Sequence, residues 1–117
     1  MTKFIDGRFV FEENCPARRV MEIFSSKRTS IVLHILYHWP EGKCRTGELQ
    51  RAIPGISKKM FVQTLRETES YGLISRHVYT VVPPNVEYAL TPLGLRFSGP
   101  IEFLFSWGKK LRNIGYL

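Results

Sequence analysis

The 117-residue sequence has few cysteines, few acidic residues and no long apolar run. Two cysteines are too few for a disulfide framework and are typical of a protein from a reducing cytoplasm. The longest apolar stretch, residues 31–39, is interrupted by His34 and His38, which argues against a membrane span. The first residues also lack the charged-then-apolar pattern of a secretory leader. We therefore expect a cytoplasmic protein with no membrane partner.

The ten acidic residues are scattered, and the sequence shows no catalytic triad, glycine-rich phosphate loop or carboxylate pair. We therefore expect no enzymatic activity and no cofactor. His34 and His38 are one helical turn apart, a spacing that can hold a metal ion. No third ligand has a suitable spacing in the sequence, and we expect no metal site.

The residues that are present indicate one globular domain with an anionic partner. The chain is 44% hydrophobic and 13% aromatic, too apolar for a disordered protein. Its net charge is +7, of which +5 lies in the 24-residue window 43–66. This charge is compatible with nucleic acid, an anionic membrane surface or an acidic protein. The alternative is that the basic cluster is only a solvated surface.

Capping and breaking residues predict the order of the elements. Residues 1–14 are expected to form a loosely ordered arm, and Cys15 is the expected N-cap of the first helix. Helices are predicted to begin at Pro16, at about Thr29, at Thr46 (as a cap), at Lys58 after the cap Ser57, and at Pro92 after the cap Thr91. Gly99-Pro100 is expected to interrupt the last of these, so that residues 101–112 form a separate helix.

Two helices joined by the short turn at Pro54-Gly55 are a helix-turn-helix. After Gly72, the β-rich runs 73–82 and 86–91 flank Pro83-Pro84-Asn85 and predict a β-hairpin. The expected fold is therefore α+β and mostly helical: a winged helix-turn-helix with a two-stranded wing and terminal dimerisation helices. We divide the chain into an N-terminal arm (1–14), the winged helix-turn-helix domain (15–112) and a C-terminal tail (113–117).

The helix predicted over 58–71 is the candidate for reading DNA. Opposite its apolar positions Phe61 and Leu65 it carries Lys58, Lys59, Val62, Gln63 and Arg66. Lysines in the first turn oppose the helix dipole at a cost of roughly 0.3–1 kcal/mol each, and phosphates at that end would offset this cost. Gln63 and Arg66 lie where base edges are met. The alternative is a solvated face.

Further DNA contacts are expected outside this helix. They are assigned to Arg45 in the basic window and to Arg76 and Asn85 in the wing, which suit the sugar-phosphate backbone or the minor groove. His77 and Tyr79 also lie in the wing. The alternative for His77 is an ordinary exposed strand residue, and for Tyr79 a packing role opposite Tyr88.

Several motifs resemble those of HxlR-type bacterial winged-helix regulators over roughly residues 14–110. They are Cys15-Pro16, Gly47-Glu48-Leu49, Ile53-Pro54-Gly55-Ile56-Ser57-Lys58-Lys59-Met60, Gln63-x-Leu65-Arg66-Glu67, Gly72-Leu73-Ile74-x-Arg76, Pro83-Pro84-Asn85-Val86-Glu87-Tyr88 and Leu90-Thr91-Pro92-x-Gly94. The resemblance implies a homodimeric DNA-binding transcriptional regulator of a prokaryotic cytoplasm, dimerised through its terminal helices. Family members usually have Gly-Lys-Trp in place of Ser26-Lys27-Arg28 and Leu in place of Thr68.

Apolar side chains on two sides of residues 101–112 predict the dimer. One side can pack on the domain's own core, which leaves Phe103 and Trp107 as an exposed patch of the kind that marks an interface. We assign Val20, Phe103 and Trp107 to this interface and expect a pseudo-palindromic operator. The alternative is that Phe103 and Trp107 cap the monomer core, covered by Met21 and the arm.

Cys15 is the candidate for chemistry. A thiol at a helix N-cap beside Arg18 and Arg19 should have a lowered pKa, which suits a sensor of oxidants or electrophiles. The alternative is a small capping residue, and Cys44 is expected to be inert. We therefore predict a sequence-specific, repressor-like and thiol-responsive regulator that binds double-stranded DNA and has an unknown effector. The competing hypothesis is a winged-helix protein–protein interaction module without a specific DNA target.

Overall fold

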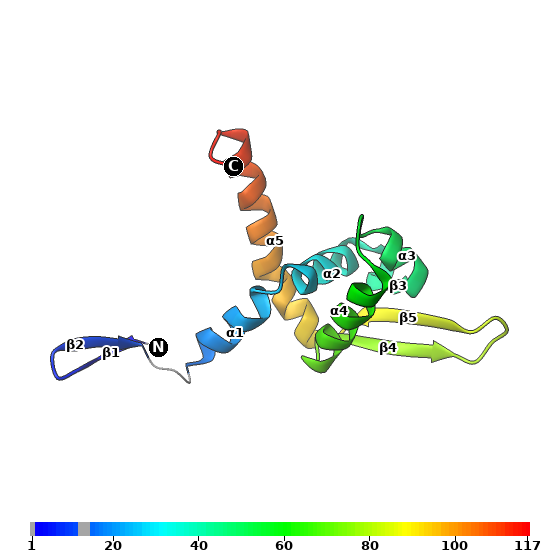
Figure 1. Ribbon diagram of the computed structural model, residues 1–117, viewed down its shortest axis with the longest axis horizontal. Helices are drawn as coiled ribbons and strands as arrows, with labels where there is room; N and C mark the ends of the chain where they lie inside the picture. Colours follow the sequence, from blue (N-terminus) through cyan, green and yellow to red (C-terminus); the bar gives the residue numbers. More distant parts are fainter. Residues whose placement is uncertain (1, 12–14) are drawn as a thin grey trace.

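Helix α2 (Lys27–His38) forms the centre of the fold in the computed structural model, which describes residues 2–11 and 15–117 (Figure 1). Helices α1 (Pro16–Phe24), α4 (Lys58–Ser70) and α5 (Pro92–Asn113) all contact it. Its buried side carries Val32, Leu33 and Leu36. The other fully buried apolar side chains of the core come from the surrounding elements and include Leu49, Phe61, Leu73, Ile74 and Ile101.

The helix-turn-helix consists of α3 (Thr46–Arg51) and α4, as predicted. Ser57 caps α4, because its Oγ accepts a hydrogen bond from the backbone N–H of Met60 at 3.1 Å. The cap expected at Thr46 is wrong. Arg45 is the N-cap of α3, and the Thr46 hydroxyl instead donates to the Val86 carbonyl at 3.2 Å. This hydrogen bond ties the start of α3 to the wing.

The wing is confirmed as an antiparallel hairpin of β4 (Ile74–Tyr79) and β5 (Asn85–Leu90). A third strand, β3 (Lys43–Arg45), pairs with β5 after the short 3-10 turn η1 (Pro40–Gly42), so the strand order is β3-β5-β4. Tyr79 does not lie opposite Tyr88, as the packing alternative required. Its cross-strand partner is Asn85, and Arg76 is the residue opposite Tyr88. The first strand of the wing ends at Tyr79 and not, as expected, at residue 82. The Tyr79 hydroxyl donates a hydrogen bond to the Glu87 carboxylate at 3.1 Å.

Helix α5 is continuous, and the expected break at Gly99-Pro100 is wrong. Pro100 lacks an N–H and so removes one hydrogen bond of the helix, but buried residues on both sides of it, Ser98 and Ile101, hold the helix against the domain. The later turns of α5 extend away from the remaining elements (Figure 1). None of the helices in the described ranges has both the length and the apolar character needed to cross a bilayer.

The N-terminal arm is a β-hairpin of β1 (Thr2–Ile5) and β2 (Arg8–Phe11), where a loosely ordered segment was expected. Asp6 and Gly7 form its two-residue turn, both with positive φ, and Asp-Gly is a strong signal for such a turn. The order of this segment is therefore a local property of the sequence. The hairpin projects beyond α1 (Figure 1), and its exposed apolar residues are Phe4, Ile5, Phe9, Val10 and Phe11.

Candidate DNA-binding surface

One face of α4 carries the side chains predicted to contact DNA. Lys58, Lys59, Gln63 and Arg66 are exposed, whereas Phe61, Leu65 and Thr68 are buried on the opposite side. Together with Val62, the four polar residues line a shallow hollow of about 600 Å³. The structure therefore brings the predicted recognition residues together on a single accessible surface.

The charge on this face has no carboxylate partner in the described part of the chain. The first turn of α4 has no acidic residue. Among the residues that the structure describes, no ion pair joins Lys58, Lys59 or Arg66 to a carboxylate. Cations at a helix N-terminus are unfavourable unless an anion approaches, and the free N–H groups of the same turn also attract phosphate. The α4 N-terminus is thus electrostatically suited to the DNA backbone.

Arg76 extends this surface onto the wing. It lies opposite the buried Tyr88 in the β4–β5 pairing, and Arg66, Arg76 and Tyr88 line one hollow of about 260 Å³. One arginine from α4 and one from the wing therefore border the same hollow, together with the carboxylate of Glu69.

Arg45 and Asn85 form a separate group. They line a different hollow, of about 450 Å³, with Arg51 from the last turn of α3. Arg51 was not among the residues assigned to DNA, although it belongs to the basic window of the sequence. The β3–β5 pairing, which could not be read from the sequence, brings Arg45 next to the wing.

The two cysteines are both buried, but the pKa values of their thiols shift in opposite directions. Cys15 is the N-cap of α1, so its thiol lies beside the first backbone N–H groups of that helix. Burial raises the pKa of the Cys15 thiol, while the nearby backbone N–H groups of Arg18 and Ala17 are among the groups that lower it, and the net direction is downward. For Cys44, burial and the nearby Glu48 carboxylate raise the pKa to about 11, so this thiol stays protonated.

The residues assigned to a dimer interface are exposed within one chain. Phe103 is 67% exposed, Trp107 50% and Val20 38%. Met21, expected in the alternative to help cover Phe103 and Trp107, is itself exposed. The described part of the chain therefore does not cover the patch on α5, which contradicts the alternative that these residues cap the monomer core.

A helix-turn-helix whose second helix presents an unbalanced basic face beside a β-hairpin wing defines a winged-helix DNA-binding protein. A family model described as HxlR-like helix-turn-helix matches residues 25–115. The chain belongs to this HxlR-like family and is a DNA-binding transcriptional regulator.

Relatives and solved structures agree with this assignment. The chain is 42% identical over 95 residues to the HTH-type transcriptional regulator YkvN of Bacillus subtilis, covering 81% of this chain and 78% of YkvN. A putative MarR-family transcriptional regulator from Porphyromonas gingivalis superposes with a TM-score of 0.78 at 40% identity, covering 87% of this chain and 97% of that one. The redox regulator HypR, in its oxidised form, superposes with a TM-score of 0.71 at 34% identity, covering 82% and 96%.

Proposed function

We propose that this regulator acts in the cytoplasm of a prokaryote as a repressor-like homodimer on a pseudo-palindromic operator. Helix α4 enters the major groove, and the wing contacts the adjoining backbone. The observation that carries the proposal is the face of α4, where Lys58, Lys59 and Arg66 are exposed and have no carboxylate partner among the described residues. Lys58 and Lys59 contact phosphates in this arrangement, while Gln63 and Arg66 reach base edges.

The two kinds of contact predict different effects of substitution. Replacing both Lys58 and Lys59 by Ala should weaken binding to all DNA sequences and reduce the slope of log affinity against log salt by about one for each phosphate that is no longer neutralised. Replacing Gln63 or Arg66 by Ala should change the preference among sites, since a good base contact is worth about 1–3 kcal/mol. Fluorescence anisotropy with DNA flanking the protein's own coding region, at several salt concentrations, measures both effects.

The matched control replaces Lys109 and Lys110 by Ala. These two exposed lysines are also adjacent in a helix, so the net charge changes equally. The control should retain the salt slope of the parent protein. If the Lys58/Lys59 variant behaved like this control, α4 would not be the DNA-reading helix, and the hypothesis of a protein–protein interaction module would be favoured.

The homodimer is supported by apolar surface that one chain leaves uncovered. The second half of α5 exposes Phe103, Leu104, Phe105 and Trp107, and the rings of Phe103 and Trp107 stack with centroids 6.4 Å apart. The N-terminal hairpin is also exposed and apolar, although an isolated two-stranded hairpin is marginally stable in water. A second copy of the chain would bury both surfaces.

We also propose that Cys15 makes the regulator responsive to oxidants. Its thiol has a lowered pKa at the start of α1, and the thiolate is the form that reacts with oxidants. A solved structure similar to this chain is that of a redox regulator. Cys15 is only 1% exposed, so the proposed oxidant is a small molecule such as hydrogen peroxide.

A further inference from the structure

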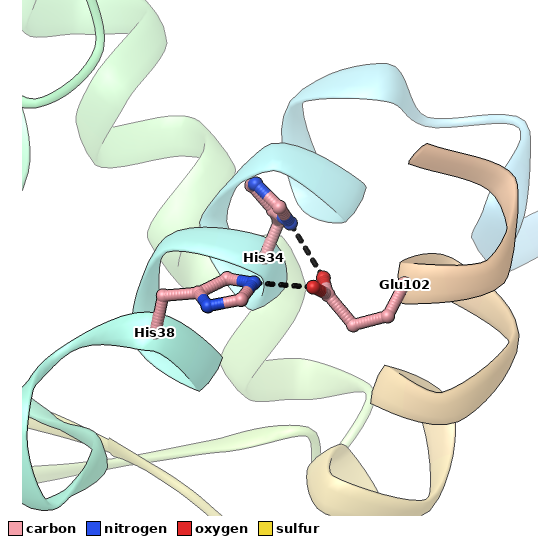
Figure 2. Close-up of side chains that lie close together, drawn as sticks. All are labelled: His34, His38 and Glu102. Atoms are coloured by element: carbon pink, nitrogen blue, oxygen red, sulfur yellow. Dashed lines mark hydrogen bonds and ion pairs between the residues drawn. The ribbon is translucent and has the colours of Figure 1, made fainter. Parts of the chain in front are cut away.

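A cluster of two histidines and one carboxylate joins α2 to α5 (Figure 2). His34 Nδ1 lies 2.5 Å from Glu102 Oε2, and His38 Nε2 contacts Glu102 Oε1. One ligand atom from each residue lies within 4.8 Å of the others. The histidines are one turn apart on α2, but Glu102 is 64 residues beyond His38. Folding thus supplies the third candidate ligand that the sequence spacing lacked.

The donor set matches the chemistry of a zinc-type ion. Two imidazole nitrogens and one carboxylate oxygen are the protein ligands of many zinc sites that keep an open fourth position. Histidines at positions i and i+4 of a helix can bind one metal ion because they lie on the same face. Metal–ligand bonds of about 2.0–2.2 Å would require these three side chains to separate modestly from the contacts that they make here.

Neighbouring groups orient two of the three side chains. The His34 ring stacks on Phe105 with centroids 3.9 Å apart and an interplanar angle of 4°, and the His38 ring packs edge-on against Tyr37. Burial raises the pKa of Glu102, but its hydrogen bonds with His34 and His38 lower it, and the net direction is downward. The contacts with both imidazole rings hold the Glu102 carboxylate between the two histidines.

The cluster borders a cavity that leaves room for a fourth ligand. The cavity has a volume of about 560 Å³, and His34 and Glu102 are part of its wall. Its wall also includes Lys109 and Arg112. Because their positive charges oppose any cation here, they favour hydroxide or a small anion as the remaining ligand.

We propose that His34, His38 and Glu102 bind one divalent transition-metal ion of the zinc type, with the fourth position open to the cavity. This site is separate from the DNA-binding surface and goes beyond the proposed function. Its ligands come from the central helix and from the helix that carries Phe103 and Trp107, so the metal would fix the position of α5 on the domain.

The test uses full-length protein freed of metal with a chelator and kept reduced. Titration with Co²⁺ should give one equivalent per chain, with visible absorption of a nitrogen–oxygen site and no thiolate charge-transfer band, and Zn²⁺ should displace it. His38→Gln and Glu102→Gln should each lower the affinity at least about 100-fold, because even the loss of an outer-shell partner costs 10- to 100-fold. His77→Gln removes the remaining histidine and should leave the affinity unchanged.

Absence of stoichiometric binding to the parent protein would overturn the proposal, as would equal affinity in His38→Gln and the parent. Circular dichroism checks that each variant folds. If Glu102→Gln fails to fold, His38→Gln decides, because the side chain of His38 is more exposed than that of Glu102. Metal binding is measured without DNA, so its failure leaves the proposed DNA-binding function untouched.

Discussion

Three hydroxyl groups form a hydrogen-bonded chain between α2 and α4. The Ser26 hydroxyl donates to Thr29 Oγ1 at 3.1 Å, and Thr29 Oγ1 lies 3.2 Å from Thr68 Oγ1. The Thr68 hydroxyl in turn donates to the Thr64 carbonyl at 2.7 Å. Thr29 and Thr68 are fully buried. Ser26 and Thr68 are both positions where the sequence departs from the family pattern, and the two departures are therefore linked through Thr29.

These hydrogen-bonded hydroxyls predict how a substitution that keeps the side-chain volume changes the free energy of unfolding. Thr68→Val keeps the side-chain volume but removes one of the two hydroxyl partners of the buried Thr29 hydroxyl, so the free energy of unfolding should fall by about 1 kcal/mol. Urea denaturation measures the change. Thr80→Val is the control, because Thr80 is exposed after β4 and should change little. If both variants were equally stable, the hydrogen bonds between these hydroxyls would contribute nothing to the free energy of unfolding.

Cys15 supports a second prediction at this scale. Hydrogen peroxide should change the DNA affinity of the parent protein and of Cys44→Ser, but not of Cys15→Ser. The reason is that the pKa of Cys15 is lowered, whereas that of Cys44 is raised to about 11. Anisotropy before and after treatment, followed by reduction with a thiol, measures the response. A full response in Cys15→Ser would remove this residue as the sensor.

At the scale of elements, the start of α5 is fixed to the corner between α4 and β4. Thr91 Oγ1 accepts a hydrogen bond from the Gly94 N–H at 3.0 Å and donates to the Gly72 carbonyl at 2.6 Å. The backbone of α5 approaches this corner so closely that a Cβ on Gly94 would lie 2.0 Å from the Leu73 carbonyl oxygen. Only glycine fits this approach.

Gly94→Ala should therefore destabilise the protein by about 1–3 kcal/mol, the usual cost of overpacking. The clash is with backbone, which cannot move aside as a side chain can. Chemical denaturation measures the loss. Gly47→Ala is the matched control, since its nearest neighbour would be the end of the Arg51 side chain at 3.4 Å. A loss of similar size in both variants would refute the argument from close approach.

Local signals predicted most of these elements. The caps Ser57 and Thr91 and the turn residues Gly55 and Gly72 act within a few residues, so their effect can be read from the sequence. Thr46 could not be assigned in this way, because the strand that accepts its hydroxyl lies 40 residues away. The helix break predicted at Pro100 is wrong for a similar reason. The turns of α5 on either side of Pro100 are buried on α2, and this burial outweighs the lost hydrogen bond.

At the scale of the whole molecule, the exposed side of α5 predicts the oligomeric state. The parent protein should sediment as a dimer at micromolar concentration, at twice the 13.6 kDa chain mass. Phe103→Glu should sediment as a monomer, because it places a charge in the centre of the apolar patch.

Val81→Glu controls for the added charge. Val81 is an exposed apolar residue in the loop between β4 and β5, and this loop lies far from the later turns of α5 (Figure 1). This variant should remain dimeric. A parent protein that sediments as a monomer would contradict the homodimer, and a Phe103→Glu variant that stays dimeric would move the interface away from this helix.

The candidate sites differ in how far the sequence could reveal them. The DNA-reading face lies on one helix, so helical periodicity was enough to bring Lys58, Gln63 and Arg66 together. The histidine–carboxylate cluster depends on the packing of α5 across α2, and no local pattern relates Glu102 to His34. The grouping of Arg45 with Asn85 likewise required the pairing of β3 with β5.

The later turns of α5 extend beyond the rest of the domain, so a small tilt of this helix becomes a larger movement at its C-terminal end. The helix is held at its first turns, at Ile101 and through the stacking of Phe105 on His34, and about 8 further residues, roughly 12 Å, extend beyond Phe105. A tilt of about 10° at Phe105 would move the far end of the helix by roughly 2 Å. Glu102 lies about one turn before Phe105. A ligand that changes the contact between Glu102 and α2 would therefore tilt α5, and the C-terminal end of the helix would move the most. In a dimer joined through the two copies of α5, a small tilt of each helix at Glu102 would change the distance between the two copies of α4.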